Sequence, residues 1–456
     1  MQRELIRKYN VQGPRYTSYP TVPFWDQTTF SSDNWLSTVQ STFNSSNESE
    51  GISIYIHLPF CEQLCTFCAC HKRITKQHSY EQPYITTVLK EWDLYLTEFR
   101  KVNKNRPILK ELHLGGGTPT FFSPENLNLL LSSIYNTVEF EDELELSFEG
   151  HPNNTSFEHL QTLYNLGFRR VSFGVQDYDP EVQKAINRIQ PFENVEQVTN
   201  WAREIGYTSI SHDLVFGLPF HNWEKMEQTI RKTLTLSPDR LAFYSYAHVP
   251  WIKGVGQRGF SEEDLPKGEE KRKLYENGKI LLKQLGYKEI GMDHFAKPND
   301  ELYTSMVNRK LHRNFMGYTS SKTQLMIGLG MSAISDSWLG FAQNEKNLED
   351  YQRAVENGQI PVIKGHILDD EDLSIRQQVL NIMCALETTW DNDSLTMSDS
   401  IIAQLQEMEK DGLIELRENG LKITDKGRPF VRNVAMAFDQ RMLRATPQTQ
   451  LFSSIL

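Results

Sequence analysis

Six segments of the chain alternate apolar and polar side chains in the way that β-strands do. They span residues 52–58, 111–115, 144–149, 170–176, 208–215 and 241–247, and about 20 to 50 residues with helical periodicity separate them. Strands that alternate with helices in this way predict a parallel sheet with helical crossovers. We therefore expect an α/β fold whose sheet is open or is closed into a partial or full barrel.

The two faces of these strands differ in polarity. Side chains alternate between faces, so the segment 144–149 places its apolar side chains on one face and Ser147 and Glu149 on the other. A parallel sheet covered by helices on both faces would be apolar on both, and the pattern therefore favours a barrel with a polar, ligand-holding lumen. Glu149, Gln176 and Asp213 come at or near the C-terminal ends of their strands, where barrel active sites lie.

Different patterns flank the strands. The Ser- and Asn-rich stretch 41–51 is typical of a surface linker, and residues 413–424 predict a β-hairpin with a Glu-Asn-Gly turn after two helical stretches. We expect three parts, which are an N-terminal arm (1–50), a barrel with a β extension (51–365) and a C-terminal domain (366–456). The last part is mainly helical and resembles a winged helix.

Charge and hydropathy narrow the class of partner. The chain has 59 acidic and 48 basic residues and a net charge of −11, which argues against a nucleic-acid partner. The longest nearly apolar run, 325–334, falls short of the roughly 20 residues of a membrane-spanning helix. The N-terminus lacks the apolar core of a signal peptide. We expect a cytoplasmic protein without a membrane partner, whose C-terminal domain is a lid or a structural element.

Four of the five cysteines lie within ten residues, as Cys61, Cys65, Cys68 and Cys70. Such clustering points to a metal or cluster site rather than to disulfides. Structural zinc remains an alternative, but it usually takes ligands from two separated pairs. A 4Fe–4S cluster is held by thiolates, and three of them would leave one iron free for a substrate or cofactor. The fifth cysteine, Cys384, lies in an apolar helical stretch and is expected in the core.

The spacing Cx3Cx2C of Cys61, Cys65 and Cys68 resembles the signature of radical S-adenosylmethionine (SAM) enzymes. We expect Cys70 to stay outside the ligand set, because a one-residue spacing points its side chain away from that of Cys68. The glycines of 115–117 let backbone approach a ligand closely.

Several polar residues are candidates for contact with SAM. Carboxylates suit a ribose diol or an amino group, and Arg188 suits a carboxylate. The alternative is a buried polar network or, for Arg188, a solvated position on a helix. His57 and His113 are expected as hydrogen-bonded interior histidines. The segments 13–20 and 312–319 are dense in polar and aromatic side chains, which favours ligand contact.

Nearly the whole chain resembles one family within the radical SAM enzymes. The motifs PRYTSYPT (14–21), CxxxCxxCxC (61–70), LHLGGGTPT (112–120) and LHRNFMGYT (311–319) are similar to those of the oxygen-independent coproporphyrinogen III oxidases, which act in haem biosynthesis. Related haem-chaperone and haem-degrading proteins typically end the cysteine motif with Cys-x-Phe and lack the arm.

The resemblance implies a partial (β/α)6 radical SAM barrel, a 4Fe–4S cluster on Cys61, Cys65 and Cys68, and two SAM molecules. Tyr55 and Glu149 are the expected catalytic residues. The implied SAM contacts are Tyr55, Phe67, Gly116, Gly117, Thr118, Glu149, Gln176, Arg188, Asp213, Ala247 and Ile334. The sequence departs from the family pattern at two places, Gly-His-Pro-Asn at 150–153 and Met316. These differences concern local contacts around the second SAM or the substrate.

The implied reaction converts two propionates of coproporphyrinogen III to vinyl groups and gives protoporphyrinogen IX. A 5′-deoxyadenosyl radical removes hydrogen from the propionate β-carbon, CO₂ is released, and one electron passes to an unknown acceptor. A reduced flavodoxin or ferredoxin is the expected electron donor, and the protein is expected to be a monomer. Arg15 and Arg313 are candidates for binding the substrate carboxylates. A haem-binding trafficking protein with the same barrel, and a zinc-stabilised winged-helix regulator, are the alternatives.

Overall fold

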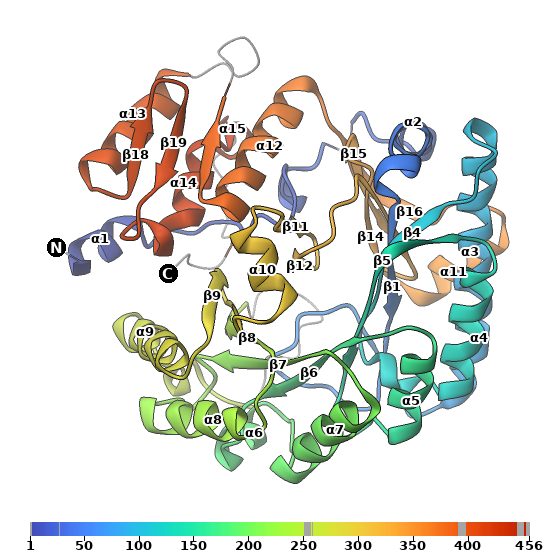
Figure 1. Cartoon of the computed structure of the whole chain (residues 1–456), viewed down its shortest axis with the longest axis horizontal. Helices are drawn as coiled ribbons and strands as arrows, with labels where there is room; N and C mark the ends of the chain where they lie inside the picture. Colours follow the sequence, from blue (N-terminus) through green and yellow to red (C-terminus); the bar gives the residue numbers. More distant parts are fainter. Residues whose placement is uncertain are drawn as a thin grey trace.

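A twelve-stranded sheet, curved into an incomplete barrel, forms the centre of the computed structural model (Figure 1). The structure describes residues 2–26, 28–249, 257, 259–390, 398–444 and 451–452. Six neighbouring strands run parallel, and they are β1 (Ile52–Leu58), β4 (Ile108–Gly116), β5 (Glu139–Gly150), β6 (Arg170–Gln176), β7 (Ser209–Phe216) and β8 (Arg240–Ser245). All six strands that the sequence pattern predicts are confirmed.

Further strands extend the sheet at both edges. Beside β1 lie β13 (Leu325–Leu329), β14 (Ile334–Asp336), β15 (Gly340–Asn344) and β16 (Val362–Ile367), and beside β8 lie β10 (His294–Ala296) and β9 (Lys288–Gly291). Among the described strands, the two end strands β16 and β9 do not pair with each other, so the barrel stays open. The predicted partial barrel with a β extension is confirmed.

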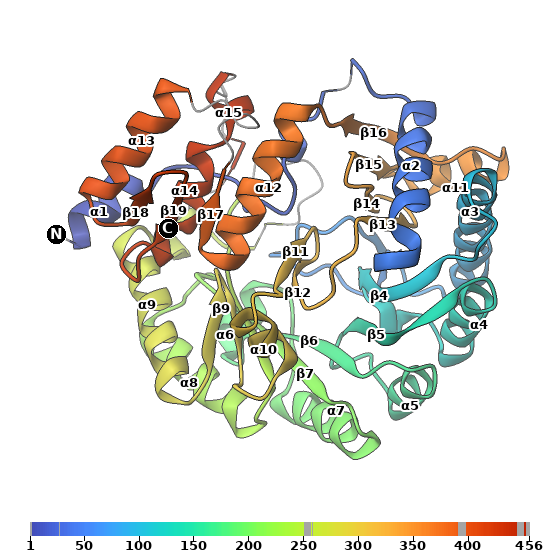
Figure 2. The ribbon, with the colours of Figure 1, turned by 45° about the horizontal axis from the view of Figure 1, so that its top comes forward.

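Helices cover the outer face of the curved sheet (Figures 1 and 2). They are α3 (Glu81–Val102), α4 (Pro124–Tyr135), α5 (Phe157–Asn165), α6 (Pro180–Ala185), α7 (Phe192–Ile205), α8 (Trp223–Thr235), α9 (Glu269–Gln284) and α11 (Leu348–Glu356). The main core lies between this layer and the sheet, and it buries Trp92, Phe148 and Phe168 completely or almost completely. Burial of such aromatic side chains supplies much of the free energy that holds the layers together. None of the described helices is long and apolar enough to cross a bilayer.

The predicted surface linker at 41–51 is wrong, because residues up to 50 belong to helix α2 (Ser32–Glu50). Phe43 is buried and stacks on Phe99 of α3 with ring centroids 4.1 Å apart. The side chain of Asn47 bonds the backbone before β4, accepting from the Ile108 amide at 2.9 Å. These packing contacts offset the weak helix propensity of the Ser- and Asn-rich sequence.

The C-terminal domain is built from helices and a small sheet, as predicted. Its elements are α12 (Asp370–Ala385), β17 (Glu387–Thr389), α13 (Asp399–Lys410), β18 (Ile414–Arg417), β19 (Gly420–Ile423), α14 (Val431–Ala437) and α15 (Gln440–Arg444). The hairpin β18–β19 is confirmed, and β16 ends two residues beyond the predicted boundary at 365. Cys384 is partly buried against Leu302, Leu311 and Tyr318.

The N-terminal arm packs into the C-terminal domain. Helix α1 (Gln2–Tyr9) and the following segment contribute Leu5, Tyr9, Tyr16 and Tyr19 to the same hydrophobic core as α12, α13 and α14. The described first and last parts of the chain therefore lie side by side (Figures 1 and 2).

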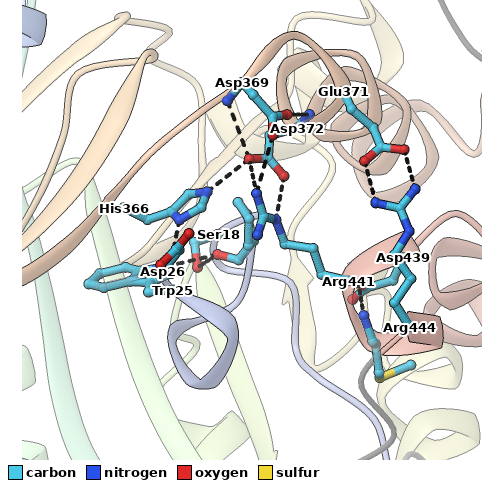
Figure 3. Close-up of polar contacts among 12 residues, drawn as sticks. Ser18, Trp25, Asp26, His366, Asp369, Glu371, Asp372, Asp439, Arg441 and Arg444 are labelled. Atoms are coloured by element: carbon cyan, nitrogen blue, oxygen red, sulfur yellow. Dashed lines mark hydrogen bonds and ion pairs between the residues drawn. The ribbon is translucent and has the colours of Figure 1, made fainter. Parts of the chain in front are cut away.

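A polar cluster joins the arm, the sheet and the C-terminal helices (Figure 3). Arg441 of α15 donates Nε and Nη2 hydrogen bonds of 2.6 and 2.7 Å to the carboxylate of Asp372, and His366 of β16 bonds the same carboxylate at 2.8 Å. The Asp26 amide of the arm donates to the other ring nitrogen of His366 at 2.9 Å. Burial alone would raise the pKa of Asp372, but the bonds from His366 and Arg441 outweigh it and lower the pKa to about 2.

Candidate active site

The cysteine cluster lies on a loop that leaves the sheet after β1. Cys61 ends the short strand β2 (Phe60–Cys61), which pairs with β3 (Arg73–Ile74), and the other cysteines lie between them. The loop is anchored to the end of α6. Thr66 donates its amide to the Ile186 carbonyl at 2.9 Å, and Asn187 donates its side chain to the Leu64 carbonyl at 2.7 Å.

The three predicted ligands are free, partly buried thiols. The Sγ of Cys61 lies 3.4 Å from Thr118 Oγ1, Arg188 Nη1 donates to Cys65 Sγ at 3.6 Å, and Lys72 donates to the Cys68 carbonyl at 3.1 Å. Two cations thus stand beside thiols that must lose their protons to bind iron.

The protonation of the thiols follows from their surroundings. Burial raises the pKa of Cys61 to about 11, whereas the hydrogen bond with Cys70 lowers the pKa of Cys68 to about 6. Among the described residues, no three histidine, cysteine or carboxylate side chains converge closely enough to hold a single metal ion.

A cavity of about 320 Å³ opens beside the cysteines. We call it the cluster cavity. Of the predicted SAM contacts, eight line it together with the three cysteines, and they are Phe67, Gly116, Gly117, Thr118, Glu149, Gln176, Arg188 and Asp213. Chain segments more than 150 residues apart thus meet at the C-terminal ends of the barrel strands, where the sequence pattern places the site.

Two glycines give the cavity its shape. A Cβ on Gly117 would lie 2.5 Å from the Pro59 carbonyl oxygen, so any side chain there would push against backbone. A Cβ on Gly174 would lie 2.7 Å from Gln176 Nε2 and 3.1 Å from Arg188 Nη2. Gly174 therefore allows these two side chains to reach the cavity, a role that the sequence analysis missed.

Tyr55 lies behind the cavity wall instead of lining it. Its hydroxyl bonds His57 Nδ1 at 3.1 Å, and its ring stacks on His113 with centroids 6.1 Å apart. His113 in turn bonds Ser147 Oγ at 2.7 Å, with Glu149 Oε1 3.6 Å from its other nitrogen. Both histidines are thus hydrogen-bonded interior residues, and the chain of contacts ends at a carboxylate that faces the cavity.

Asp213 has a protonation equilibrium near neutral pH. Burial raises its pKa to about 7, helped by the negative charge of Glu149 and opposed by a 2.9 Å bond from Ser172 Oγ. Ser172, Glu149 and Asp213 also line a second cavity of about 140 Å³ in the barrel lumen, which we call the lumen cavity.

Three predicted residues lie elsewhere. Ala247 lines a third cavity, near Arg15, and Ile334 packs beside Trp25 and Phe341. Arg313 is buried and donates to the arm carbonyls of Tyr16 and Arg15 at 3.3 and 3.1 Å, so its guanidinium holds the arm in place.

Arg15 forms an ion pair with the buried Asp293.

Lys72 and His151 line the cluster cavity without having been predicted as site residues. Burial, followed by the charge of Arg188, lowers the pKa of His151, so a neutral imidazole faces the cavity. His151 belongs to the segment Gly-His-Pro-Asn (150–153), where the sequence differs from the family pattern. That difference was the signal that could have pointed to it.

The fold and the thiol-lined cavity define a radical SAM enzyme, and a model of the radical SAM superfamily matches residues 55–233. A relative from Helicobacter pylori (strain J99), an oxygen-independent coproporphyrinogen III oxidase, is 38% identical over 96% of both chains. The Escherichia coli K12 relative of the same name is 35% identical over 99% of this chain and 98% of its own.

A solved structure of the Escherichia coli coproporphyrinogen III oxidase, a radical SAM enzyme, superposes with a TM-score of 0.87 at 34% identity, covering 96% of this chain and 98% of that one. The chain belongs to the family of oxygen-independent coproporphyrinogen III oxidases.

Proposed function

We propose that this protein decarboxylates two propionate side chains of coproporphyrinogen III to vinyl groups and so forms protoporphyrinogen IX without oxygen. The observation that carries the proposal is the convergence of three partly buried cysteines with Phe67 and seven glycine or polar residues in one cavity. Family membership supports the choice of substrate.

The donor set fits the cofactors that the family implies. Cys61, Cys65 and Cys68 would hold a 4Fe–4S cluster, with Cys70 outside the ligand set, and the cluster cavity would hold SAM. When bound, these groups supply the one-electron chemistry that makes a radical able to remove hydrogen from a propionate β-carbon. Two SAM molecules are proposed from the resemblance, and the shared lining residues Glu149, Ser172 and Asp213 put the cluster cavity next to the lumen cavity.

Each polar group of the cavity has a chemical task in this proposal. Arg188 suits the SAM carboxylate, because its guanidinium already faces the Cys65 thiol. Backbone at Gly116 and Gly117 can approach the ligand, and Thr118 and Gln176 offer hydrogen bonds. The carboxylates of Glu149 and Asp213 suit the ribose diol and the amino group.

Tyr55 and Glu149 are the proposed catalytic residues. Glu149 keeps about half of its side chain (48%) exposed toward the cavity, and the His113 contact sets its orientation. Tyr55 acts behind it by stacking on His113. Of the remaining predicted contacts, Phe67 offers an aromatic face beside the cysteines, and Ala247 and Ile334 are proposed from the resemblance.

The proposed electron donor is a reduced flavodoxin or ferredoxin, in a cytoplasmic, monomeric protein with an unknown final acceptor. Cys70, His71 and Arg73 are exposed, which would let a donor protein approach the cluster closely.

An anaerobic turnover assay tests the proposal. The cluster is reconstituted and reduced, SAM and coproporphyrinogen III are added with a cell extract as electron acceptor, and protoporphyrin and 5′-deoxyadenosine are quantified. We expect both products, and we expect Cys65→Ser to abolish them while Cys384→Ser keeps them. Formation of deoxyadenosine without protoporphyrin would overturn the assignment of coproporphyrinogen III as the substrate. Neither product from protein with an intact cluster would favour haem trafficking instead.

A further inference from the structure

The third cavity, of about 110 Å³, is lined by residues of the arm, of α9, of the C-terminal domain and of the ends of β7 and β8. We call it the rim cavity. Its charged lining residues are Arg15, Lys271, Arg272, Arg428, Arg432, Glu289 and Asp293. Basic side chains therefore outnumber acidic ones by five to two in the lining of a small cavity.

The acidic members are already neutralised by cations. Asp293 is paired with Arg15, and Glu289 lies 2.5 and 2.8 Å from the ammonium groups of Lys279 and Lys283. Arg272 is likewise paired, with Glu276 of its own helix. Arg428 lies 3.3 Å from Asp425, at the edge of the C-terminal domain.

Lys271 has no ion-pair partner within the part of the chain that the structure describes. Its ammonium donates to the Tyr246 carbonyl at 2.6 Å, and burial lowers its pKa to about 8. Burial, followed by the charge of Arg15, lowers the pKa of Arg432 to about 10. Both shifts mean that the charged forms are disfavoured here, and a bound anion would stabilise them.

We propose that the rim cavity binds a propionate carboxylate of the tetracarboxylate substrate, with Lys271 and Arg432 as its cationic contacts. The identity of the ligand rests on the proposed function. A cavity of this size admits a carboxylate-bearing side chain but not a macrocycle, so one propionate enters while the ring stays outside.

The position of the cavity fits this use. The guanidinium of Arg15 lies 5.9 Å from the ring centre of Tyr244, and Tyr244 lines the lumen cavity with Glu149 and Asp213. Asp293 of the rim cavity adjoins His294, another residue of the lumen cavity. A macrocycle over the lumen could therefore place one propionate in the rim cavity and another toward the cluster cavity.

SAM is the competing source of a carboxylate, because Ala247, a predicted SAM contact, lines the same cavity.

Kinetics of the reconstituted holoenzyme separate binding of the substrate carboxylate from binding of the SAM carboxylate. We expect Lys271→Met to raise the KM for coproporphyrinogen III about tenfold or more, as the loss of a charge-assisted hydrogen bond does, and to leave the KM for SAM unchanged. Arg432→Gln should act in the same direction.

Lys273→Met is the matched control. Lys273 lies two residues further along α9, is exposed and lines a different groove, so its removal takes away the same charge without touching the rim cavity. Both KM values should remain those of the parent protein. An unchanged substrate KM in both Lys271→Met and Arg432→Gln overturns the proposal. A rise in the KM for SAM instead overturns the assignment to the substrate.

A binding measurement keeps the test independent of turnover. Quenching of coproporphyrin III fluorescence by the holoenzyme reports affinity, and the tetramethyl ester of the same porphyrin lacks the carboxylates. Weaker binding of the acid by Lys271→Met and Arg432→Gln, but not by Lys273→Met, supports the site even if no protoporphyrin forms. Equal binding by all variants, with normal turnover, overturns the site and leaves the proposed function intact. Circular dichroism and iron content show that each variant has folded.

Discussion

The guanidinium of Arg188 joins the cysteine loop to strand β6, with Nη1 3.6 Å from Cys65 Sγ while Nη2 donates to the Gly174 carbonyl. One side chain thus holds Cys65, a proposed cluster ligand, and faces the cavity that we assign to SAM. We expect Arg188→Lys, which keeps the charge but loses the forked geometry, to raise the KM for SAM about tenfold. Iron content should stay near that of the parent protein, and a loss of iron would instead make Arg188 a support for the cluster.

Gly117 and Gly174 should respond differently to alanine. At position 117 the new Cβ meets the Pro59 backbone, which cannot move without a large cost in free energy. At position 174 it meets the ends of two side chains, which can move. We expect Gly117→Ala to destabilise the fold by about 1–3 kcal/mol. Gly174→Ala should lower stability less but raise the KM for SAM, because Gln176 and Arg188 must move. Thermal unfolding and SAM kinetics measure the two effects, and equal losses of stability would contradict the distinction.

The Arg441–Asp372 pair should contribute measurably to stability. Asp372 is almost completely buried, so Arg441→Gln leaves its charge with fewer partners, and we expect a loss of about 1–3 kcal/mol at pH 7. Arg444→Gln removes the neighbouring pair with Glu371, whose side chains are 61% and 42% exposed, and should cost under about 1 kcal/mol. Denaturant unfolding of both variants gives the comparison.

The same pair predicts a pH dependence. The pKa of Asp372 is lowered from 3.8 to about 2 in the folded state, so its stabilising contribution is present above 3.8 and is lost as the pH falls toward 2. The difference in unfolding free energy between the parent protein and Arg441→Gln should therefore narrow over that interval. A difference that stays constant would show that Asp372 is not the titrating partner.

Asp213 should make SAM binding sensitive to pH near neutrality. Because its pKa is raised to about 7, the carboxylate form gains population as the pH rises through 7. If this form bonds SAM, the KM for SAM should fall over the same range. Asp213→Asn should have a higher KM that no longer follows this titration, and a parent profile that is flat between pH 6 and 8 would contradict the role.

Strand periodicity was sufficient to predict the barrel and its polar lumen, because alternation of side chains directly records which face is buried. It failed at α2, where Ser and Asn suggest a loop and only the packing of Phe43 and Asn47 shows a helix. Arg313 illustrates another limit, since an arginine in a motif does not reveal whether it faces a ligand or its own backbone.

The rim cavity could not have been predicted from local sequence. Arg15, Lys271 and Arg432 come from the arm, from α9 and from the C-terminal domain, and no spacing rule connects them. They converge only because the arm packs into the C-terminal core.

That packing has a consequence for synthesis on the ribosome. Most of the core around Tyr16 and Tyr19 comes from Ile375 and later residues, which emerge roughly 356 residues afterwards (375 − 19). At about 5 to 20 residues per second, these aromatic side chains wait about 20 to 70 seconds without the core they belong to. The arm therefore leaves the ribosome well before the core that it completes, and it is among the last segments to reach its native place.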